Sequence, residues 1–172
     1  MKLTRNIVLL VAGLALAACT NPGRFGADGS GAGGVGAGGG AIVPGSANDP
    51  TSAAYFNQTI GDRVLFAVDE STISDAGRLT LNGQATWLTS NPDFTAVIEG
   101  HADEQGTREY NVALGARRAN AVREYLVSRG VAANRLSTVS YGKERPIEIC
   151  SNEACYAKNR RAVTVLASGL SS

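Results

Sequence analysis

Apolar residues recur with two different spacings along residues 51–168 and predict a domain with both helices and strands. A spacing of three or four, as in Leu81, Ala85 and Leu88, is typical of a helix that buries one face. Short runs rich in Val, Ile, Phe and Thr indicate strands. The expected helices are 74–90, capped by Ser74 and ended at Asn91-Pro92, and 109–129, stopped by Gly130. The expected strands are 63–68, 94–99, 136–141 and 162–166, with a polar loop over 100–107 and a loop with room for a short helix over 146–157.

The order of these elements, in which strands alternate with helices, predicts the fold class. We expect a small α/β sandwich, that is, an α+β domain whose helices pack on one face of a four-stranded sheet. Residues 51–168 form this domain and residues 169–172 are a short tail. The sequence shows no internal repeat.

One arginine of the longest helix lies where apolar residues are expected. At about 100° per residue, Leu114 and Val122 share a broad apolar arc that also contains Arg118, whereas Arg117 falls outside it. A buried guanidinium is costly unless it is paired. We expect Asp103 to be its partner, because this residue lies in the loop just before the helix, near the helix N-terminus that favours anions.

The first eighteen residues have the features of an export signal for a lipoprotein. Lys2 and Arg5 give a positive start, and the apolar run that follows is too short to span a bilayer. The run ends in the letters LAAC, which resemble a bacterial lipobox. That resemblance implies cleavage of residues 1–18 and a permanent anchor of three acyl chains on Cys19, since one chain binds membranes weakly. A plain signal peptide with a nearby cysteine is the alternative. Thr20, in place of an Asp, favours the outer membrane.

A glycine-rich stretch separates Cys19 from the predicted domain. Residues 20–50 hold eleven of the 21 glycines, with Ala, Ser, Asn and Pro in most other positions. A phosphate-binding loop needs a preceding strand and a following Gly-Lys-Ser/Thr, and the sequence has neither. We therefore expect residues 19–50 to be a lipidated cysteine followed by a disordered tether that spans roughly 30 Å.

Composition argues against several classes of function. With 16 basic and 15 acidic residues, the chain lacks the basic excess of a general nucleic-acid-binding protein. The single histidine rules out a His-rich metal site, and His101 with Cys150 and Cys155 would lack a fourth zinc ligand. Asp103 and Glu104 are adjacent in a loop and tend to point apart, so they make a poor acid–base pair. We expect neither catalysis nor a cofactor.

A longer motif surrounds the unusual arginine. The string GHADEQGTREYNVALGARRANAV occupies residues 100–122, the letters SYG occupy 140–142, and KNRRAV occupies 158–163. Together these segments resemble the OmpA-like peptidoglycan-binding domain, and the lipobox makes the resemblance closest to the lipoproteins of that family. The resemblance covers residues 55–168, approximately, and implies an OmpA-like fold with a four-stranded mixed sheet.

The resemblance implies non-covalent binding of diaminopimelate in the stem peptides of peptidoglycan. One end of this amino acid carries both an ammonium and a carboxylate. The family's pair falls on Asp103, for the ammonium, and on Arg118, whose planar fork suits a carboxylate. The alternative is an internal salt bridge between the two residues that only orients the loop, and both arrangements are compatible before a ligand arrives.

Three further positions of the long motif are secondary candidates. His101 either lines the site or is a structural hydrogen-bonding group. Asn111 and Leu114 match family positions. We expect Asn111 to fix the loop beside the ligand and Leu114 to lie in the core.

Two other segments contribute candidates from outside the long motif. Of Arg160 and Arg161, which open the last strand, one is expected to support the binding loop, and Arg161 is taken as the site residue. The alternative is a solvated pair of arginines without a role in the site. Many relatives carry an acid directly after the phenylalanine that corresponds to Phe66, where this chain has Ala67. We expect Asp69 to replace that acid in contacts with the ligand.

Two cysteines remain after Cys19. Cys150 and Cys155 are five positions apart in an exported chain, and an exported chain folds in an oxidising compartment. We expect them to form a disulfide that stiffens the segment before residues 159–161.

The resemblance also implies location and partners. It places the domain in the periplasm, anchored to the outer membrane, where it tethers that membrane to the wall and supports envelope integrity and cell division. It implies a role in the Tol–Pal system, with TolB competing for an overlapping surface. The alternatives are a wall-binding lipoprotein of another envelope complex without a Tol partner, and an envelope enzyme.

Overall fold

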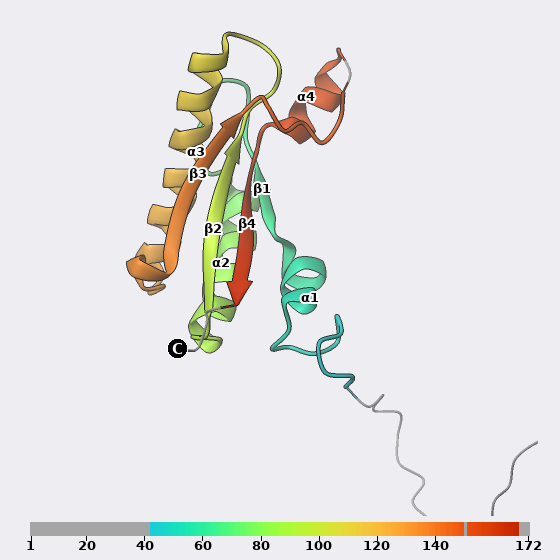
Figure 1. Ribbon diagram of the computed structural model, residues 1–172, viewed down its shortest axis with the longest axis vertical. Helices are drawn as coiled ribbons and strands as arrows, with labels where there is room; N and C mark the ends of the chain where they lie inside the picture. The colour runs from blue at the N-terminus through green and yellow to red at the C-terminus, as the bar shows by residue number, and fades with distance from the viewer. Residues whose placement is uncertain (1–41, 150, 169–172) are drawn as a thin grey trace, which may run out of the picture. The chain divides into compact units, whose positions relative to one another are not determined.

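The computed structural model describes residues 42–149 and 151–168 (Figure 1). The predicted signal segment, Cys19, most of the predicted tether and Cys150 lie outside the described residues. The helical elements are α1 Ala53–Tyr55, the π-helical turn η1 Phe56–Gly61, α2 Asp75–Ser90, α3 Arg108–Ser128, the 3-10 turn η2 Ala133–Arg135 and α4 Glu153–Asn159. The strands are β1 Arg63–Leu65, β2 Phe94–His101, β3 Leu136–Gly142 and β4 Arg161–Ser168.

The four strands form one mixed sheet in the order β1-β4-β2-β3. β4 runs antiparallel to both of its neighbours, whereas β2 and β3 are parallel and are joined through α3. Helices α2 and α3 lie on the same side of the sheet, behind it in Figure 1. This arrangement confirms the predicted four-stranded sheet with its helices on one face.

The two long helices begin where side-chain caps stand in the sequence. Ser74 Oγ accepts the backbone N–H of Gly77 at 3.1 Å, and Thr107 Oγ1 accepts that of Tyr110 at 3.2 Å. These bonds satisfy donors that have no partner within the first turn. At the other end of α3, Gly130 adopts a φ of +98°, which few residues other than glycine tolerate.

The first strand is shorter than predicted. The expectation was 63–68, but β1 ends at Leu65. Phe66 still donates its backbone N–H to Arg160 at 2.9 Å, and the chain then turns at Asp69, whose φ is +57°. This turn aims the carbonyls of Ala67 and Glu70 toward α3, where they are needed as acceptors.

Short helical segments accompany the two long helices, and one of them, α4, begins in the loop 146–157 that had room for a short helix. Helix α4 lies at the end of the predicted loop 146–157 and is capped by Asn152, whose Oδ1 accepts the N–H of Cys155 at 3.1 Å. Before β1, α1 and η1 cover the end of α2, and Trp87 Nε1 donates to the carbonyl of Pro50 at 2.7 Å.

The core lies between the sheet and the two long helices. Leu81 and Leu88 of α2, Ile98 of β2 and Leu126 of α3 have no exposed surface. Burial of four such side chains contributes on the order of 6–12 kcal/mol before the entropy of ordering is counted. The predicted apolar positions of both helices are therefore the ones that hold them on the sheet.

Glycines allow α3 to approach the sheet closely beside the loop after β2. A Cβ on Gly100 would lie 1.8 Å from the carbonyl oxygen of Gly115, and a Cβ on Gly115 would lie 2.4 Å from Ser140 Oγ. The Ser140 hydroxyl could rotate, but a Cβ on Gly115 would also lie 2.8 Å from the carbonyl oxygen of Gly100, so a backbone atom opposes a side chain at both positions. The contact fixes the first half of α3 against the end of β2.

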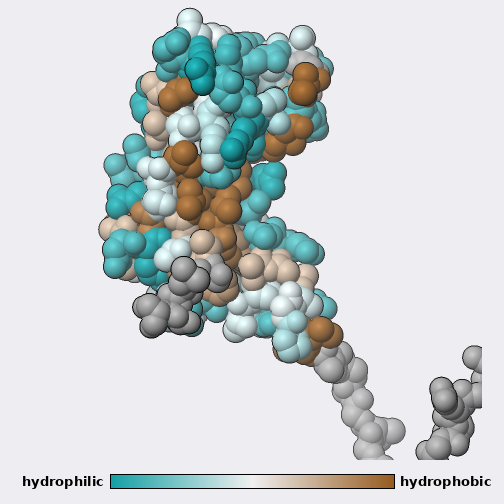
Figure 2. Space-filling model, viewed as in Figure 1, coloured by the Kyte–Doolittle hydropathy of each residue, from teal (hydrophilic) through white to brown (hydrophobic). Residues whose placement is uncertain are grey.

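Within residues 42–149 and 151–168, no helix covers the other face of the sheet. Figure 2 shows apolar side chains gathered over its centre, and the most exposed apolar side chains of its strands are Leu65 and Val165. Among the described residues, no helix is both long enough and apolar enough to cross a bilayer.

Candidate functional site

A cavity lies at the end of the sheet where β2 runs into the loop 102–107. Its volume is about 270 Å³. Three segments form its walls: the turn after β1, the loop after β2 and the first turns of α3. The lining residues are Val68, Asp69, Asp103, Gln105, Gly106, Tyr110, Asn111 and Leu114. Because its two charged lining residues are both aspartates, the cavity suits the ammonium group of a ligand.

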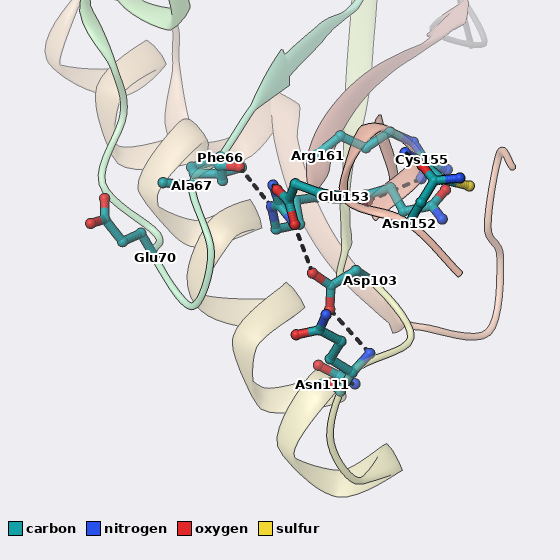
Figure 3. Close-up of polar contacts among 12 residues, drawn as sticks. Phe66, Ala67, Glu70, Asp103, Asn111, Asn152, Glu153, Cys155 and Arg161 are labelled. Carbon is teal, nitrogen blue, oxygen red and sulfur yellow. Dashed lines mark hydrogen bonds and ion pairs between the residues drawn. The ribbon is translucent and has the colours of Figure 1, made fainter. Parts of the chain in front are cut away.

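Asp103 is 7% exposed, and each of its carboxylate oxygens has a partner. Oδ2 lies 3.1 Å from Nη1 of Arg160, and Oδ1 accepts the backbone N–H of Gln105 at 3.2 Å. Figure 3 shows the carboxylate between Asn111 and Glu153. Since a carboxylate offers about four lone-pair sites, Asp103 can still accept a donor from the cavity.

Arg118 has no exposed surface, and its partners are backbone carbonyls rather than a carboxylate. Nε donates to Glu70 O at 2.7 Å, Nη1 to His101 O at 2.9 Å and Nη2 to Ala67 O at 3.0 Å. The expectation that Asp103 would pair with Arg118 is therefore wrong. The turn after β1 supplies the acceptors, and it lies about fifty residues earlier in the chain.

Arg118 remains positively charged although it is buried. Burial lowers the pKa of Arg118 to about 10, and the nearby Asp103 carboxylate opposes that shift, so the guanidinium stays protonated at neutral pH. Its planar group also lies 5.2 Å from the centre of the Phe66 ring. Arg118 thus places a fixed positive charge behind the cavity.

His101 contributes its carbonyl to the site, but its imidazole does not line the cavity. The ring is 1% exposed, lies 5.6 Å from the Tyr141 ring and approaches Glu99 Oε2 at 3.7 Å. Burial lowers the pKa of His101 to about 4, with Arg161 and Arg145 adding to the shift. The lining role considered for His101 is not what the geometry supports.

Arg160, and not Arg161, is the arginine beside Asp103. Arg161 donates to the carbonyls of Asn159 at 3.3 Å and Arg145 at 3.1 Å, away from the cavity lining. Adjacent residues at the start of a strand point to opposite faces of the sheet. The expected supporting arginine is therefore Arg160, and the assignment of Arg161 to the site is corrected.

Asp69 and Tyr110 close one side of the cavity. The Tyr110 hydroxyl donates to Asp69 Oδ1, and this hydrogen bond raises the pKa of Tyr110. Arg117 lies over the Tyr110 ring at 5.9 Å. The structure thus brings Asp69 to the same cavity as Asp103, whereas Ala67 contributes only its carbonyl.

Asn111 and Leu114 come from the cavity face of α3. Asn111 is 1% exposed, and its Nδ2 donates to Gln105 O at 2.8 Å, so it holds the loop as expected. Leu114 is 4% exposed and borders both the core and the cavity.

Several contacts around the site were not anticipated from the sequence. Lys143 Nζ donates to Gly106 O at 2.7 Å, and Tyr156 of α4 hydrogen-bonds Glu104, which raises the pKa of Tyr156. Tyr110 lies within the motif over residues 100–122, so the sequence already placed it close to the site. Lys143 and Tyr156 reach the loop from distant parts of the chain, and no pattern in the sequence indicated their contacts.

The remaining sequence predictions concern cysteines and metals. Cys155 is 1% exposed on α4 and is disulfide-bonded. Cys150 lies outside the described residues, so the pairing of Cys150 with Cys155 stays a prediction. Across residues 42–149 and 151–168, no group of three or more His, Cys, Asp or Glu side chains is placed to hold a metal ion.

Known proteins resemble this chain over nearly all of its length. The OmpA family model matches residues 65–160. A protein of Rhizobium meliloti named peptidoglycan-associated lipoprotein is 50% identical over 166 residues, which cover 95% of this chain and 89% of that protein. A protein of the same name from Haemophilus influenzae is 41% identical over 157 residues, covering 90% and 94% of the two chains.

A solved structure agrees with the fold. The crystal structure of the peptidoglycan-associated lipoprotein from Burkholderia pseudomallei superposes with a TM-score of 0.63 at 39% sequence identity. The match covers 70% of this chain and 98% of that chain.

Proposed function

Because the chain belongs to the OmpA family, we propose that its domain binds peptidoglycan and tethers the outer membrane to the cell wall. The observation that carries this function is the acidic cavity formed by Asp69 and Asp103 at the end of the sheet. The proposal includes lipidation of Cys19, with the domain facing the periplasm. Binding is non-covalent, and no residue is assigned a catalytic role.

The proposed ligand group is the zwitterionic end of diaminopimelate. Its ammonium meets Asp103, and Asp69 lines the same cavity. Its carboxylate meets Arg118, which uses three of its five N–H groups on backbone carbonyls. Since Arg118 has no exposed surface, this contact requires the turn after β1 or the loop 102–107 to move aside.

A sedimentation assay with purified peptidoglycan sacculi tests the proposal. The unaltered chain is expected to sediment with sacculi, and free diaminopimelate is expected to release it. Asp103→Asn keeps the shape of the side chain and removes its charge, so it is expected to weaken binding about thirtyfold or more. Arg78→Gln, at an exposed position on α2, is the matched control and is expected to bind normally. Normal binding by a folded Asp103→Asn variant would refute the assignment of the site.

Partner binding is a separate part of the proposal. The relatives' name, peptidoglycan-associated lipoprotein, supports a role in the Tol–Pal system. We propose that TolB competes with the wall for an overlapping surface of this domain. Purified TolB is then expected to displace the chain from sacculi. If TolB and sacculi bind at the same time without competition, the overlapping surface is wrong.

The proposed disulfide joins Cys150 to Cys155 beside the site. Alkylation of the chain from the periplasm without reduction, followed by mass spectrometry, is expected to leave both cysteines unlabelled. Labelling of both would exclude the bond. Closure of so short a loop stabilises the fold by about 2 kcal/mol.

A further inference from the structure

Arg160 connects three parts of the molecule that are distant in sequence. Its Nη1 lies 3.1 Å from Asp103 Oδ2, its Nε donates to Phe66 O at 3.2 Å, and its Nη2 contacts Glu153 Oε1. Its backbone N–H donates to Tyr156 O at 3.0 Å. The guanidinium therefore joins the loop after β2 and the end of β1 to α4. Figure 3 shows Asp103, Phe66 and Glu153 gathered around this point.

Arg160 and Asp103 are nearly buried, whereas Glu153 is exposed to water. The side chains of Arg160 and Asp103 are 5% and 10% exposed, whereas that of Glu153 is 65% exposed. An ion pair between two nearly buried groups is screened little by water, and removal of one partner leaves the other charge unpaired. Glu153 is in water, so it adds less energy but fixes the outer edge of the guanidinium.

The balance of charge explains how Asp103 remains an acceptor. The charged side chains at the cavity and at the Arg160 contact are three carboxylates and two guanidinium groups, so their net charge is −1; they are Asp69, Asp103, Glu153, Arg118 and Arg160. Asp103 therefore keeps its attraction for an ammonium group even though one of its oxygens faces an arginine. The same contact prevents the carboxylate from rotating toward solvent.

We infer that Arg160 is a positioning residue that holds the Asp103 carboxylate in the orientation the ligand requires, and that α4 holds Arg160 through Glu153. The inference rests on the proposed function, because it gives Asp103 a ligand. It goes beyond that function by assigning α4, which does not line the cavity, to the control of affinity.

Calorimetry with free meso-diaminopimelate as the probe tests the inference on the full mature chain in detergent. Arg160→Gln is expected to weaken binding about tenfold or more, because the buried carboxylate loses its partner. Arg135→Gln is the matched control, since Arg135 donates to the carbonyls of Leu88, Asn91 and Phe94 at the opposite end of β2. It is expected to lower the melting temperature and leave the dissociation constant unchanged.

Two conservative variants separate positioning from folding. Arg160→Lys keeps a cation near Asp103 but cannot span all three partners, so it is expected to recover part of the lost affinity. Glu153→Gln removes the outer contact at an exposed position and is expected to weaken binding about threefold. If Arg160→Gln does not fold, Glu153→Gln decides, and an unchanged dissociation constant overturns the inference.

Tighter binding of diaminopimelate by Arg160→Gln would also contradict the inference. If Arg160 only competes with the ligand for Asp103, then Arg160→Gln binds diaminopimelate more tightly, and the inference is overturned. Equal affinities for Arg160→Gln and the unaltered chain also overturn it, while the proposed function stands. Failure of the unaltered chain to bind diaminopimelate overturns both.

Discussion

Arg118 stabilises the fold independently of any ligand in the cavity, because it donates hydrogen bonds to three backbone carbonyls. Its apolar surroundings made it recognisable in the sequence as a residue that needs a partner. The partner was not recognisable, because Ala67 and Glu70 offer carbonyls that only the turn after β1 directs toward α3. Side-chain type says nothing about where a backbone oxygen points.

The stability of Arg118 variants tests whether the fold needs Arg118 as the donor to these carbonyls. Arg118→Ala is expected to lower the free energy of unfolding by about 3 kcal/mol or more, because buried carbonyls lose their donor. Urea denaturation measures the change. Arg117→Ala removes an exposed side chain of the same kind and is expected to change the free energy of unfolding by about 0.5 kcal/mol or less. Equal stability of the two variants would contradict the burial of Arg118.

His101 predicts a dependence of stability on pH. Its pKa is lowered from 6.5 to about 4 by burial, so the unfolded chain takes up a proton before the folded one does. Above pH 6.5, approximately, His101 is neutral in both states and does not change the free energy of unfolding. As the pH falls toward 4, protonation of the unfolded chain lowers the free energy of unfolding progressively, by about 3 kcal/mol at most. His101→Gln is expected to lose less stability than the unaltered chain between pH 7 and pH 4.5. Parallel pH profiles of the two melting temperatures would exclude His101 as the cause.

At the scale of elements, the contact of α3 with β2 sets the distance between the loop of Asp103 and the helix of Arg118. The backbones meet at Gly100 and Gly115, whose missing side chains let the helix approach the strand. In the sequence, both glycines are noticeable only as part of the motif over residues 100–122. Their role depends on two elements that meet in space.

The glycine contact predicts a specific sensitivity. Gly100→Ala places a Cβ 1.8 Å from a backbone oxygen that cannot rotate away, so α3 must shift. We expect a loss of about 3 kcal/mol of folding free energy and, with it, loss of sacculus binding. Gly83→Ala is the control, because its Cβ would meet only a side-chain methyl, Cγ2 of Ile60, at 3.1 Å and no backbone atom. Thermal melts by circular dichroism compare the two, and a Gly100→Ala variant as stable as Gly83→Ala would exclude the close contact.

Elements with local signals were predictable and elements held by distant contacts were not. Helices α2 and α3 start at their side-chain caps, and α3 stops at Gly130, within one or two residues of the expectation. Strand β1 ended early because the turn at Asp69 serves Arg118. Helix α4 was not firmly predicted because seven residues are only about two turns, too few to show a helical repeat of apolar positions. Its link to Asp103 through Arg160 spans 57 positions and leaves no pattern in the sequence.

At the scale of the whole domain, the cavity and the entry of the chain lie at opposite ends of the sheet. The cavity follows the last residue of β2, whereas Pro50 is bound by Trp87 near the start of that strand. Figure 1 shows α1 at the lower end of the domain and α4 at the upper end. The length of the domain therefore separates Pro50 from the cavity.

The proposed anchor predicts that location and wall binding can be separated. Cys19→Ser removes the acylated residue, while the domain of residues 42–168 keeps all of its described contacts. The variant is expected to leave the membrane fraction and still sediment with purified sacculi as strongly as the unaltered chain, because Cys19 is not among the residues that line the cavity. Fractionation must follow digestion of the wall, since wall fragments would otherwise carry the domain with the membrane. If Cys19→Ser still sediments with outer membrane after that digestion, the lipid on Cys19 is not the anchor.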